Sequence, residues 1–440
     1  MAVRRSAPRA GGASALGEVE EVRVYFGRIP RFSPSFAPVD AWAATRALLT
    51  RPSDSEEVAR FEAAFASYIG ARHAIMTPSA RYAFYLLLQA MGIGADDEVV
   101  MPGLTYFAIP SIAVTAGVRP VFADIGRTTH VLDPAAFEAA IGPRTRAVVP
   151  THLYGTPCDM DAILAIARAR GIRVIEDCAQ STGARYRGRR VGGLGDAAYY
   201  TFGLTKNMTT LSGAMITTDD DDVAASCRAA IDATTPGGLG KAAKEAATGL
   251  AMMLATHPVV YPWTLHPAIR AGNALGRDPI HEPFGEPEVL YDTLPSSFRT
   301  SRPRAVQAAV GCEQLARIER FNGARRTNGA RLDEALAGIP GVEVPTYPDG
   351  AEPIYMSFVV HHARRDAFMA ALRARGVDTT VGYMNDCSDH PLFPAHRRPC
   401  PEAARARREQ VHLPVHPRMD EADVAHVARA VREAAAEVGT

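Results

Sequence analysis

Two side chains with complementary chemistry stand out in the chain, because each follows an apolar, strand-like run. Lys206 comes shortly after the run 197–202, and Asp177 comes shortly after the run 173–175. A lysine amine can form a Schiff base with the aldehyde of pyridoxal 5'-phosphate (PLP), and a buried carboxylate can keep the pyridine nitrogen protonated. A lone lysine is more often a solvated surface charge. The pair, in this order and setting, predicts a PLP site.

Further polar residues lie close to this pair in the sequence. Gln180 follows Asp177 by three residues, within reach of the phenolic oxygen of the ring, although a Gln there can equally be a polar loop residue. Thr201 offers a hydroxyl on the side of Lys206. Taken alone, Asp177 fits a helix cap or a structural hydrogen bond equally well.

A phosphate-binding turn and an aromatic platform can be placed upstream. The segment 77–81 ends in Ser79, Ala80 and Arg81 and precedes a helical run, and backbone N–H groups at a helix N-terminus bind phosphate. The signal is weak by itself, because Ser and Thr cap helices generally. Tyr106 follows another apolar run and can stack on the pyridine face, or can belong to the core.

The elements that must position these residues alternate between strand and helix patterns over residues 98–218. Short apolar runs separated by amphipathic stretches predict a mainly parallel sheet covered by helices. One helix is predicted from a cap at Asp159 to a stop at Gly171. In such sheets ligands bind outside the carboxyl ends of the strands, where His152, Asp177 and Thr201 fall.

The 440 residues exceed the size at which one core keeps growing, so a large and a smaller domain are expected. We expect a disordered leader over residues 1–17 and a large α/β domain over 18–305 that contains an apolar insertion at about 236–290. A smaller α+β domain is expected over 306–440, with a strand at 355–360 and helices at 366–375 and 420–435. A helix near 305–314 is predicted to link the two domains.

Composition narrows the class of protein. The chain is 47% hydrophobic and 22% charged, with 48 basic and 48 acidic residues, which argues against nucleic-acid binding. The six cysteines have no CxxC spacing, which argues against a metal site and a disulfide framework and favours the cytoplasm.

The apolar stretch 250–271 breaks the strand–helix pattern. It carries Met252, Met253, Tyr261 and Trp263 but is interrupted by prolines and histidines, so it is too broken to span a bilayer. We expect it to cover the active-site mouth or to contact a partner subunit, with interfacial membrane contact as a minor alternative.

Six sequence blocks in order resemble the DegT/DnrJ/EryC1/StrS family of PLP-dependent sugar aminotransferases over residues 30–436. They include "TPSARYAFYLLLQAMGIGADDEVVMPGLTY", "THLYGTPCDMDAI", "VIEDCAQSTGARYRGRRVGGLGDAAYYTFGLTKN" and "VHLPVHPRMDEADV". The resemblance implies the fold-type-I architecture and a homodimer whose partner chain helps to complete each active site. It implies the following site residues: Lys206 as the Schiff-base lysine, Asp177 on the pyridine nitrogen, Gln180 near the phenolic oxygen, Tyr106 stacked on the ring, and Thr201, Ala80 and Arg81 on the phosphate.

Several positions differ from the usual family pattern. The phosphate loop, commonly Ser-Gly-Thr or Ser-Gly-Ser, is Ser79-Ala80-Arg81, and Thr300 stands where the partner chain usually offers Asn. The frequent His-Tyr pair before a late His-Pro appears as Gly382-Tyr383. These changes leave the expected cofactor chemistry in place and weaken the inference of a sugar nucleotide.

The leading hypothesis is an aminotransferase that converts a ketone or aldehyde, a nucleotide-linked keto-sugar or a keto-cyclitol, to the amine with glutamate or glutamine as donor. A PLP-dependent dehydratase is disfavoured because those relatives tend to replace the lysine by histidine, and Lys206 is present. An aminotransferase for an apolar carbonyl compound and a non-catalytic PLP-binding sensor remain as alternatives.

Overall fold

The computed structural model describes residues 28–274, 288–291, 293–295 and 302–440. The predicted leader and Thr300 lie outside the described residues.

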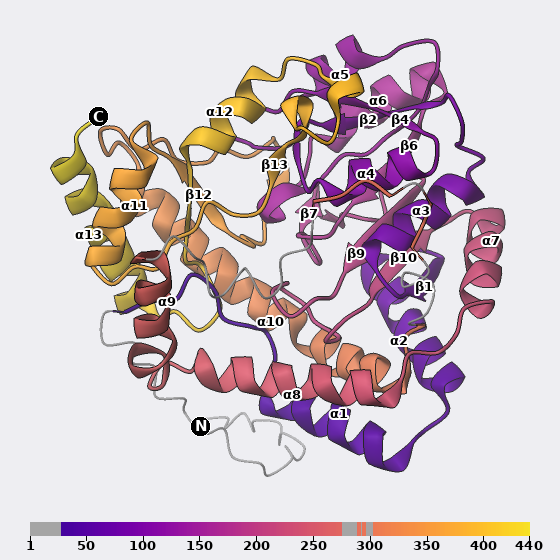
Figure 1. Ribbon diagram of the computed structural model, residues 1–440, viewed down its shortest axis with the longest axis horizontal. Coiled ribbons are helices and arrows are strands. Elements are labelled where there is room, and N and C mark those ends of the chain that lie inside the picture. Colours follow the sequence, from indigo (N-terminus) through magenta and orange to yellow (C-terminus); the bar gives the residue numbers. More distant parts are fainter. Residues whose placement is uncertain (1–27, 275–287, 292, 296–301) are drawn as a thin grey trace, which may run out of the picture.

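A seven-stranded sheet forms the centre of the large domain, with the strand order β1-β10-β9-β6-β5-β2-β4 (Figure 1). Only β10 runs antiparallel to its neighbours, which confirms the mainly parallel sheet. The strands are β1 (His73–Thr77), β2 (Glu98–Pro102), β4 (Arg119–Ala123), β5 (Thr145–Val148), β6 (Arg173–Asp177), β9 (Ala197–Thr201) and β10 (Ala214–Thr218).

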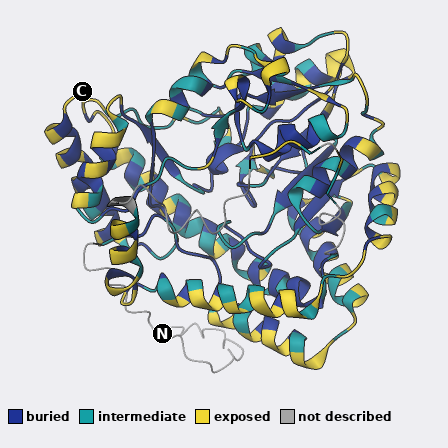
Figure 2. Cartoon of the chain, viewed as in Figure 1, coloured by how far each residue is buried: buried dark blue, intermediate teal, exposed yellow. Residues whose placement is uncertain are grey.

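Helices cover this sheet, and their inward faces are buried (Figure 2). They are α1 (Pro38–Thr50), α2 (Asp54–Ile69), α3 (Ala80–Ala90), α4 (Ala108–Thr115), α5 (Pro134–Ala140), α6 (Met160–Arg170) and α7 (Asp221–Asp232). Helix α6 is the one predicted from its caps. The Asp159 carboxylate accepts from the backbone N–H of Ala162 at 3.2 Å, and Gly171 ends the helix with φ of 63°.

The long helix α10 (Ala305–Leu336) leads from the large domain to the C-terminal part of the chain (Figure 1). There β12 (Phe358–His361) pairs antiparallel with β14 (Gln410–Leu413), flanked by α11 (Arg365–Ala374), α12 (Pro401–Glu409) and α13 (Glu421–Val438). The strand expected at 355–360 begins only at Phe358, because Tyr355 adopts a left-handed φ of 49°. Ile29, Tyr261 and Ile269 join the core of this part, so segments from the beginning and the middle of the chain contribute to it.

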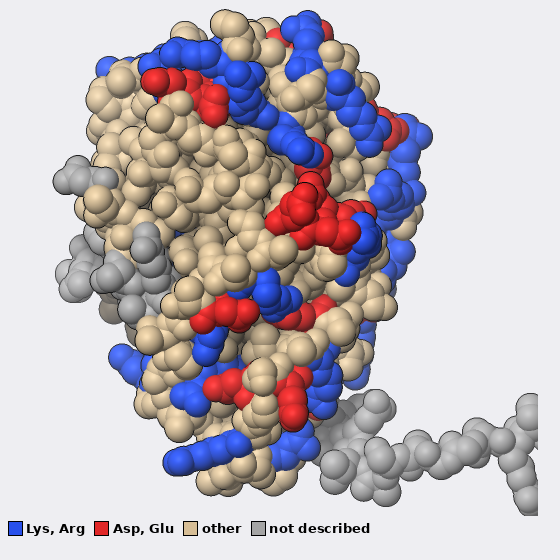
Figure 3. All heavy atoms as spheres, turned by 90° about the vertical axis from the view of Figure 1, so that its right-hand side faces the viewer, with Lys and Arg blue, Asp and Glu red and all other residues tan. Residues whose placement is uncertain are grey.

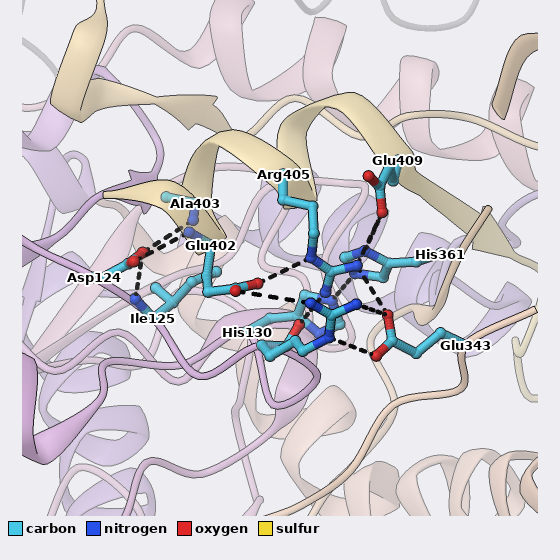
Figure 4. A network of polar contacts seen from close by, with 10 residues as sticks. Asp124, Ile125, His130, Glu343, His361, Glu402, Ala403, Arg405 and Glu409 are labelled. Carbon is cyan, nitrogen blue, oxygen red and sulfur yellow. Dashed lines mark hydrogen bonds and ion pairs between the residues drawn. The ribbon is translucent and has the colours of Figure 1, made fainter. Parts of the chain in front are cut away.

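A polar network fastens the C-terminal part to the large domain (Figure 4). The guanidinium of Arg405 on α12 pairs with Glu343, Glu402 and Glu409 at 2.8–2.9 Å and donates to the backbone oxygen of Arg127. Beside it, the imidazoles of His130 and His361 meet through their Nε2 atoms. Short strands make a second link, where β13 (Asn385–Asp386) pairs with β3 (Leu104–Thr105). A third small sheet joins β11 (Ala351–Glu352), β7 (Arg185–Tyr186) and β8 (Arg189–Arg190).

The apolar stretch 250–271 is helical in three pieces: the end of α8 (Leu239–Ala255), the 3₁₀ turn η2 (Tyr261–Trp263) and most of α9 (Leu265–Ala274). Helix α8 packs against α1 and against Leu204 and Leu211 of the loop that follows β9. Across the parts of the chain that the structure describes, no helix combines the length and apolar character needed to cross a membrane. The two predicted roles, a cover for the active-site mouth and a subunit contact, stay predictions.

Candidate active site

The sheet register brings the two phosphate-side segments to one edge. Thr77 at the end of β1 is the partner of Ala214, and Ala214 is the partner of Thr201 at the end of β9. The turn that leads from β1 into α3 therefore starts in the same row of the sheet as the Thr201 hydroxyl. This edge is the one at which the parallel strands end.

Helix α3 begins as its sequence suggested. Ser79 is the N-cap, and its hydroxyl accepts from the backbone N–H of Tyr82 at 3.3 Å. Ala80 and Arg81 are the first helical residues and are half-buried. The first N–H groups of a helix have no partner within the helix, so this turn presents donors and the positive end of the helix dipole to an anion.

Asp177 is the last residue of β6 rather than a residue beyond the strand, and it is 4% exposed. Its Oδ1 accepts from the backbone N–H of Ala179 at 2.9 Å, and its register partner on β9 is Tyr199. Burial raises the pKa of the Asp177 carboxyl, and the Ala179 N–H, the Tyr199 hydroxyl and the charge of Lys206 only partly offset that effect. A buried carboxylate in this state is stabilised by a further cation, which a protonated pyridine nitrogen supplies.

Lys206 lies in the loop after β9 and is half-buried. Its Nζ donates to the Tyr383 hydroxyl at 3.2 Å and lies 5.3 Å from the centre of the Tyr383 ring. The next residue anchors the loop, since the Asn207 amide donates to the backbone oxygen of Thr182 at 2.7 Å and Ser35 donates to the backbone oxygen of Asn207 at 2.8 Å. These hydrogen bonds of Asn207 fix the backbone next to Lys206, and the lysine amine points to the ring of Tyr383.

Tyr106 belongs to the same group of side chains. Its ring packs edge-on against Tyr383, with centres 6.1 Å apart and planes at 86°. Tyr106 directly follows β3, and Tyr383 lies two residues before β13, so the pairing of β3 with β13 brings the two tyrosines together. The structure therefore joins Lys206, Tyr106 and Tyr383 beside the pairing of β3 with β13.

Gln180 is buried beside the same edge of the sheet. Its Oε1 accepts from the backbone N–H of Tyr154 at 3.0 Å, and its Nε2 lies 3.8 Å from the sulfur of Met384. The side-chain oxygen of Gln180 therefore already accepts a hydrogen bond within the protein. The amide nitrogen is the group that suits the phenolic oxygen of a bound ring, and this role of Gln180 stays a prediction.

His152, Glu176 and Cys178 lie close enough to resemble a metal cluster, with potential ligand atoms within 4.8 Å of one another. The Glu176 carboxylate, however, accepts from His152 Nε2 at 3.0 Å and from three backbone N–H groups at 2.7–2.8 Å, those of Gly192, Leu194 and Gly195. Burial raises the pKa of the Cys178 thiol, which keeps it protonated and a poor metal ligand. These contacts make the cluster a structural network under the sheet edge.

Sequence reasoning left two site residues out. Tyr383 was noted only as a departure from a family pattern, and the surviving tyrosine of that pattern was the signal that could have placed it at the site. Tyr199 carried a weaker signal: it lies on the strand next to that of Asp177, but the register that pairs them could not be predicted.

The residues present fit PLP. An amine, a carboxylate that lacks a full complement of partners, a helix N-terminus and an aromatic side chain meet at the carboxyl edge of a parallel sheet, the place where such sheets bind ligands. Fold and site together define the class: a fold-type-I aminotransferase.

The chain belongs to the DegT/DnrJ/EryC1/StrS aminotransferase family, whose model matches residues 46–250 and 299–432. It is 31% identical over 393 residues to the spore coat polysaccharide biosynthesis protein SpsC of Bacillus subtilis, covering 87% of this chain and 90% of that protein. It is also 31% identical to the dTDP-3-amino-3,4,6-trideoxy-alpha-D-glucose transaminase of Streptomyces venezuelae, covering 92% and 96%. The structure of S. venezuelae DesV in complex with a ketimine intermediate superposes with a TM-score of 0.73 at 29% identity, covering 92% of this chain and 98% of that one.

Proposed function

We propose that this protein is a PLP-dependent aminotransferase that converts a nucleotide-linked keto-sugar to the amino-sugar, with glutamate or glutamine as donor. The observation that carries the proposal is the placement of Asp177 and Lys206 at one sheet edge, since Asp177 ends β6 and Lys206 follows β9, the strand paired with β6. The S. venezuelae transaminase supports a sugar as the substrate class, since the match to it covers 92% of this chain.

In this proposal each residue has a separate task. Asp177 holds a proton on the pyridine nitrogen, the α3 turn at Ala80 and Arg81 with Thr201 binds the phosphate, and Gln180 donates to the phenolic oxygen. When bound, PLP supplies the aldehyde that accepts the donor's amino group and the electron-withdrawing ring that acidifies the neighbouring carbon.

Lys206 Nζ would hold the aldehyde group of PLP when no substrate is bound. When its amine is unbound, Lys206 Nζ would take up and return a proton as general base and acid. The Tyr383 hydroxyl, 3.2 Å away, orients this amine. Over the full cycle the donor becomes an oxo acid, and the carbonyl of the acceptor becomes an amine.

We further propose that the enzyme acts in the cytoplasm as a homodimer with shared active sites. Figure 3 shows a broad area without Lys, Arg, Asp or Glu on one side of the molecule. Depletion of charge is typical of the centre of a subunit interface.

A two-part experiment tests the function. Purified protein loaded with PLP is mixed with glutamate alone, and release of one equivalent of 2-oxoglutarate per subunit is expected. A panel of nucleotide-linked 3-keto and 4-keto sugars is then added, and amination is read by mass spectrometry. Reduction with borohydride before proteolysis should place the cofactor on the peptide that contains Lys206.

The Lys206→Ala variant is the control. It should lose both half-reactions and the reductive labelling while its circular dichroism spectrum stays that of the wild type. Transamination at the wild-type rate by this variant would overturn the assignment of the lysine. Wild-type release of 2-oxoglutarate without amination of any sugar would overturn the substrate class alone.

A further inference from the structure

The outer surface formed by α1, α8 and the η2 turn exposes an unusual set of apolar side chains, which we call the α1–α8 face. On α1 they are Val39, Trp42 and Leu49, spaced so that they share one side of the helix. The tryptophans Trp42 and Trp263 are 66% and 70% exposed, and the chain has only these two. The remaining members are Leu250, Leu254, Val259 and Val260.

The charges on this face have one sign. Among residues 28–51 and 236–272, the exposed charged side chains are Arg46, Arg51, Lys241, Lys244 and Arg270. Neither acidic residue of these segments is exposed, although the half-buried Glu245 lies 3.9 Å from Lys241. Asp40 is fully buried and accepts from Gln314 at 2.7 Å, and Glu245 accepts from the Ser212 hydroxyl at 2.9 Å.

This bias is local, because the whole chain carries 48 basic and 48 acidic residues. On the side shown in Figure 3, acidic side chains lie beside basic ones. Exposed tryptophan and leucine combined with lysine and arginine only is the composition of helices that lie in the headgroup region of an anionic bilayer. Indole rings in particular concentrate at that boundary.

Buried residues on the inner side of α8 and η2 hold the α1–α8 face in place without a bound partner. Met253 and Ala242 of α8 pack into the core with Phe36, and Tyr261 and Ile269 are buried in the C-terminal core. Gly249 lies against Leu211, where an added Cβ would be 3.1 Å from the leucine side chain. The inner side of α8 therefore supports the loop that carries Lys206, while its outer side remains exposed.

The family comparison sets part of this face apart. The family model leaves residues 251–298 unmatched, so η2, α9 and the end of α8 lie outside the shared family sequence. A second copy of the chain on this face would bring arginines and lysines against arginines and lysines, which is unfavourable. An anionic surface has the complementary charge.

We propose that the α1–α8 face binds the surface of an anionic lipid membrane, with Trp42 and Trp263 inserted at headgroup level and the basic side chains on the lipid phosphates. The contact is peripheral, since the helices lie along the surface. In this arrangement α8 lies between the lipid headgroups and the loop that carries Lys206. The proposal does not depend on which carbonyl compound the enzyme aminates.

The full-length protein is tested by flotation with vesicles of phosphatidylcholine alone or mixed with phosphatidylglycerol. Binding is expected only with phosphatidylglycerol, and it should weaken as salt is raised. Replacing Lys241 and Lys244 by Glu should weaken binding at least about tenfold. The matched control replaces Arg168 and Arg170, two exposed basic residues of α6, by Glu and should bind as the wild type does.

Tryptophan fluorescence gives an independent reading. The variants Trp42→Phe and Trp263→Phe each retain a single indole, and both should show a blue-shifted emission with phosphatidylglycerol vesicles. Failure of the wild type to float with any vesicle, or a shift in neither variant, would overturn the proposal. A shift in one variant alone would overturn the common face and confine the contact to one element. Dissociation of a dimer in the doubly substituted Trp42→Ala, Trp263→Ala protein would assign the face to a second copy instead.

Discussion

Glu176 and Asp177 are consecutive carboxylates at the end of β6, yet their surroundings differ sharply because successive side chains of a strand point to opposite faces. Burial raises the pKa of Glu176, but hydrogen bonds from His152 and from the backbone of Gly192 and Gly195 outweigh it, and the net pKa is lowered. For Asp177 burial prevails, and the pKa is raised.

The difference separates a structural acid from one that suits a ligand. On the Glu176 side the fold itself supplies the donors and gains stability from the charge. On the Asp177 side the fold buries a carboxylate without enough donors, which costs stability until a cation arrives. Sites that bind or react with ligands are where such imbalances are expected.

Asp177→Asn should have the largest effect on activity. An amide cannot keep the pyridine nitrogen protonated, so we expect kcat/KM to fall by about 3 to 5 kcal/mol of transition-state stabilisation. Because the raised pKa means that the buried charge destabilises the fold, the cofactor-free variant should melt at the wild-type temperature or above it. Kinetics and calorimetry on the same preparation check both. A variant with near-normal kcat would make Asp177 structural.

Glu176→Gln should show the reverse pattern. One carboxylate oxygen becomes an NH₂ group that faces N–H donors, so the free energy of unfolding should fall by about 2 to 4 kcal/mol. Activity per folded molecule should stay within a few-fold of the wild type, since Glu176 lies on the other face of the strand. Denaturant unfolding with active-site titration measures the two quantities. Loss of activity without loss of stability would show that the two carboxylates share one role.

Most of the residues proposed to form the site around Asp177 could be predicted from the sequence. Asp177 ends β6, Gln180 follows it by three residues and Lys206 follows β9, so residue type and position relative to a strand end together carry the signal. Tyr383 could not be derived in this way. It lies 177 residues from Lys206 and arrives through the pairing of two-residue strands, which are too short to show any periodicity.

Helices and strands were likewise predictable only where their signals are local in the sequence. Caps such as Asp159 and Gly171 predicted α6 because they act through local hydrogen bonds and backbone conformation. The strand expected at 355–360 began late, because Tyr355 turns left-handed where its ring packs over Gly329 of α10. That contact between distant segments is invisible in the sequence pattern.

The smallest expected effect concerns the His130–His361 contact beside the Arg405 network (Figure 4). The two Nε2 atoms face each other, so one ring must donate and the other accept, and a further proton would set two donors against each other. Burial lowers the pKa of His361 from 6.5 to about 3, assisted by the charges of Arg405 and Arg127. Burial likewise lowers the pKa of His130.

A pKa that is lowered on folding means that the unfolded chain binds the proton more readily, so stability should decrease as the pH falls below about 6.5. Between pH 6.5 and pH 5 the loss from His361 should reach about 2 kcal/mol at most. His361→Gln keeps a polar partner for His130 but does not titrate, so its stability should depend less steeply on pH. Urea unfolding at a series of pH values measures the slope, with His73→Gln as the control, at a half-buried histidine that pairs with Asp221 away from this contact. Parallel curves for the wild type and His361→Gln would contradict this prediction, because protonation of the buried His361 would then not lower the stability.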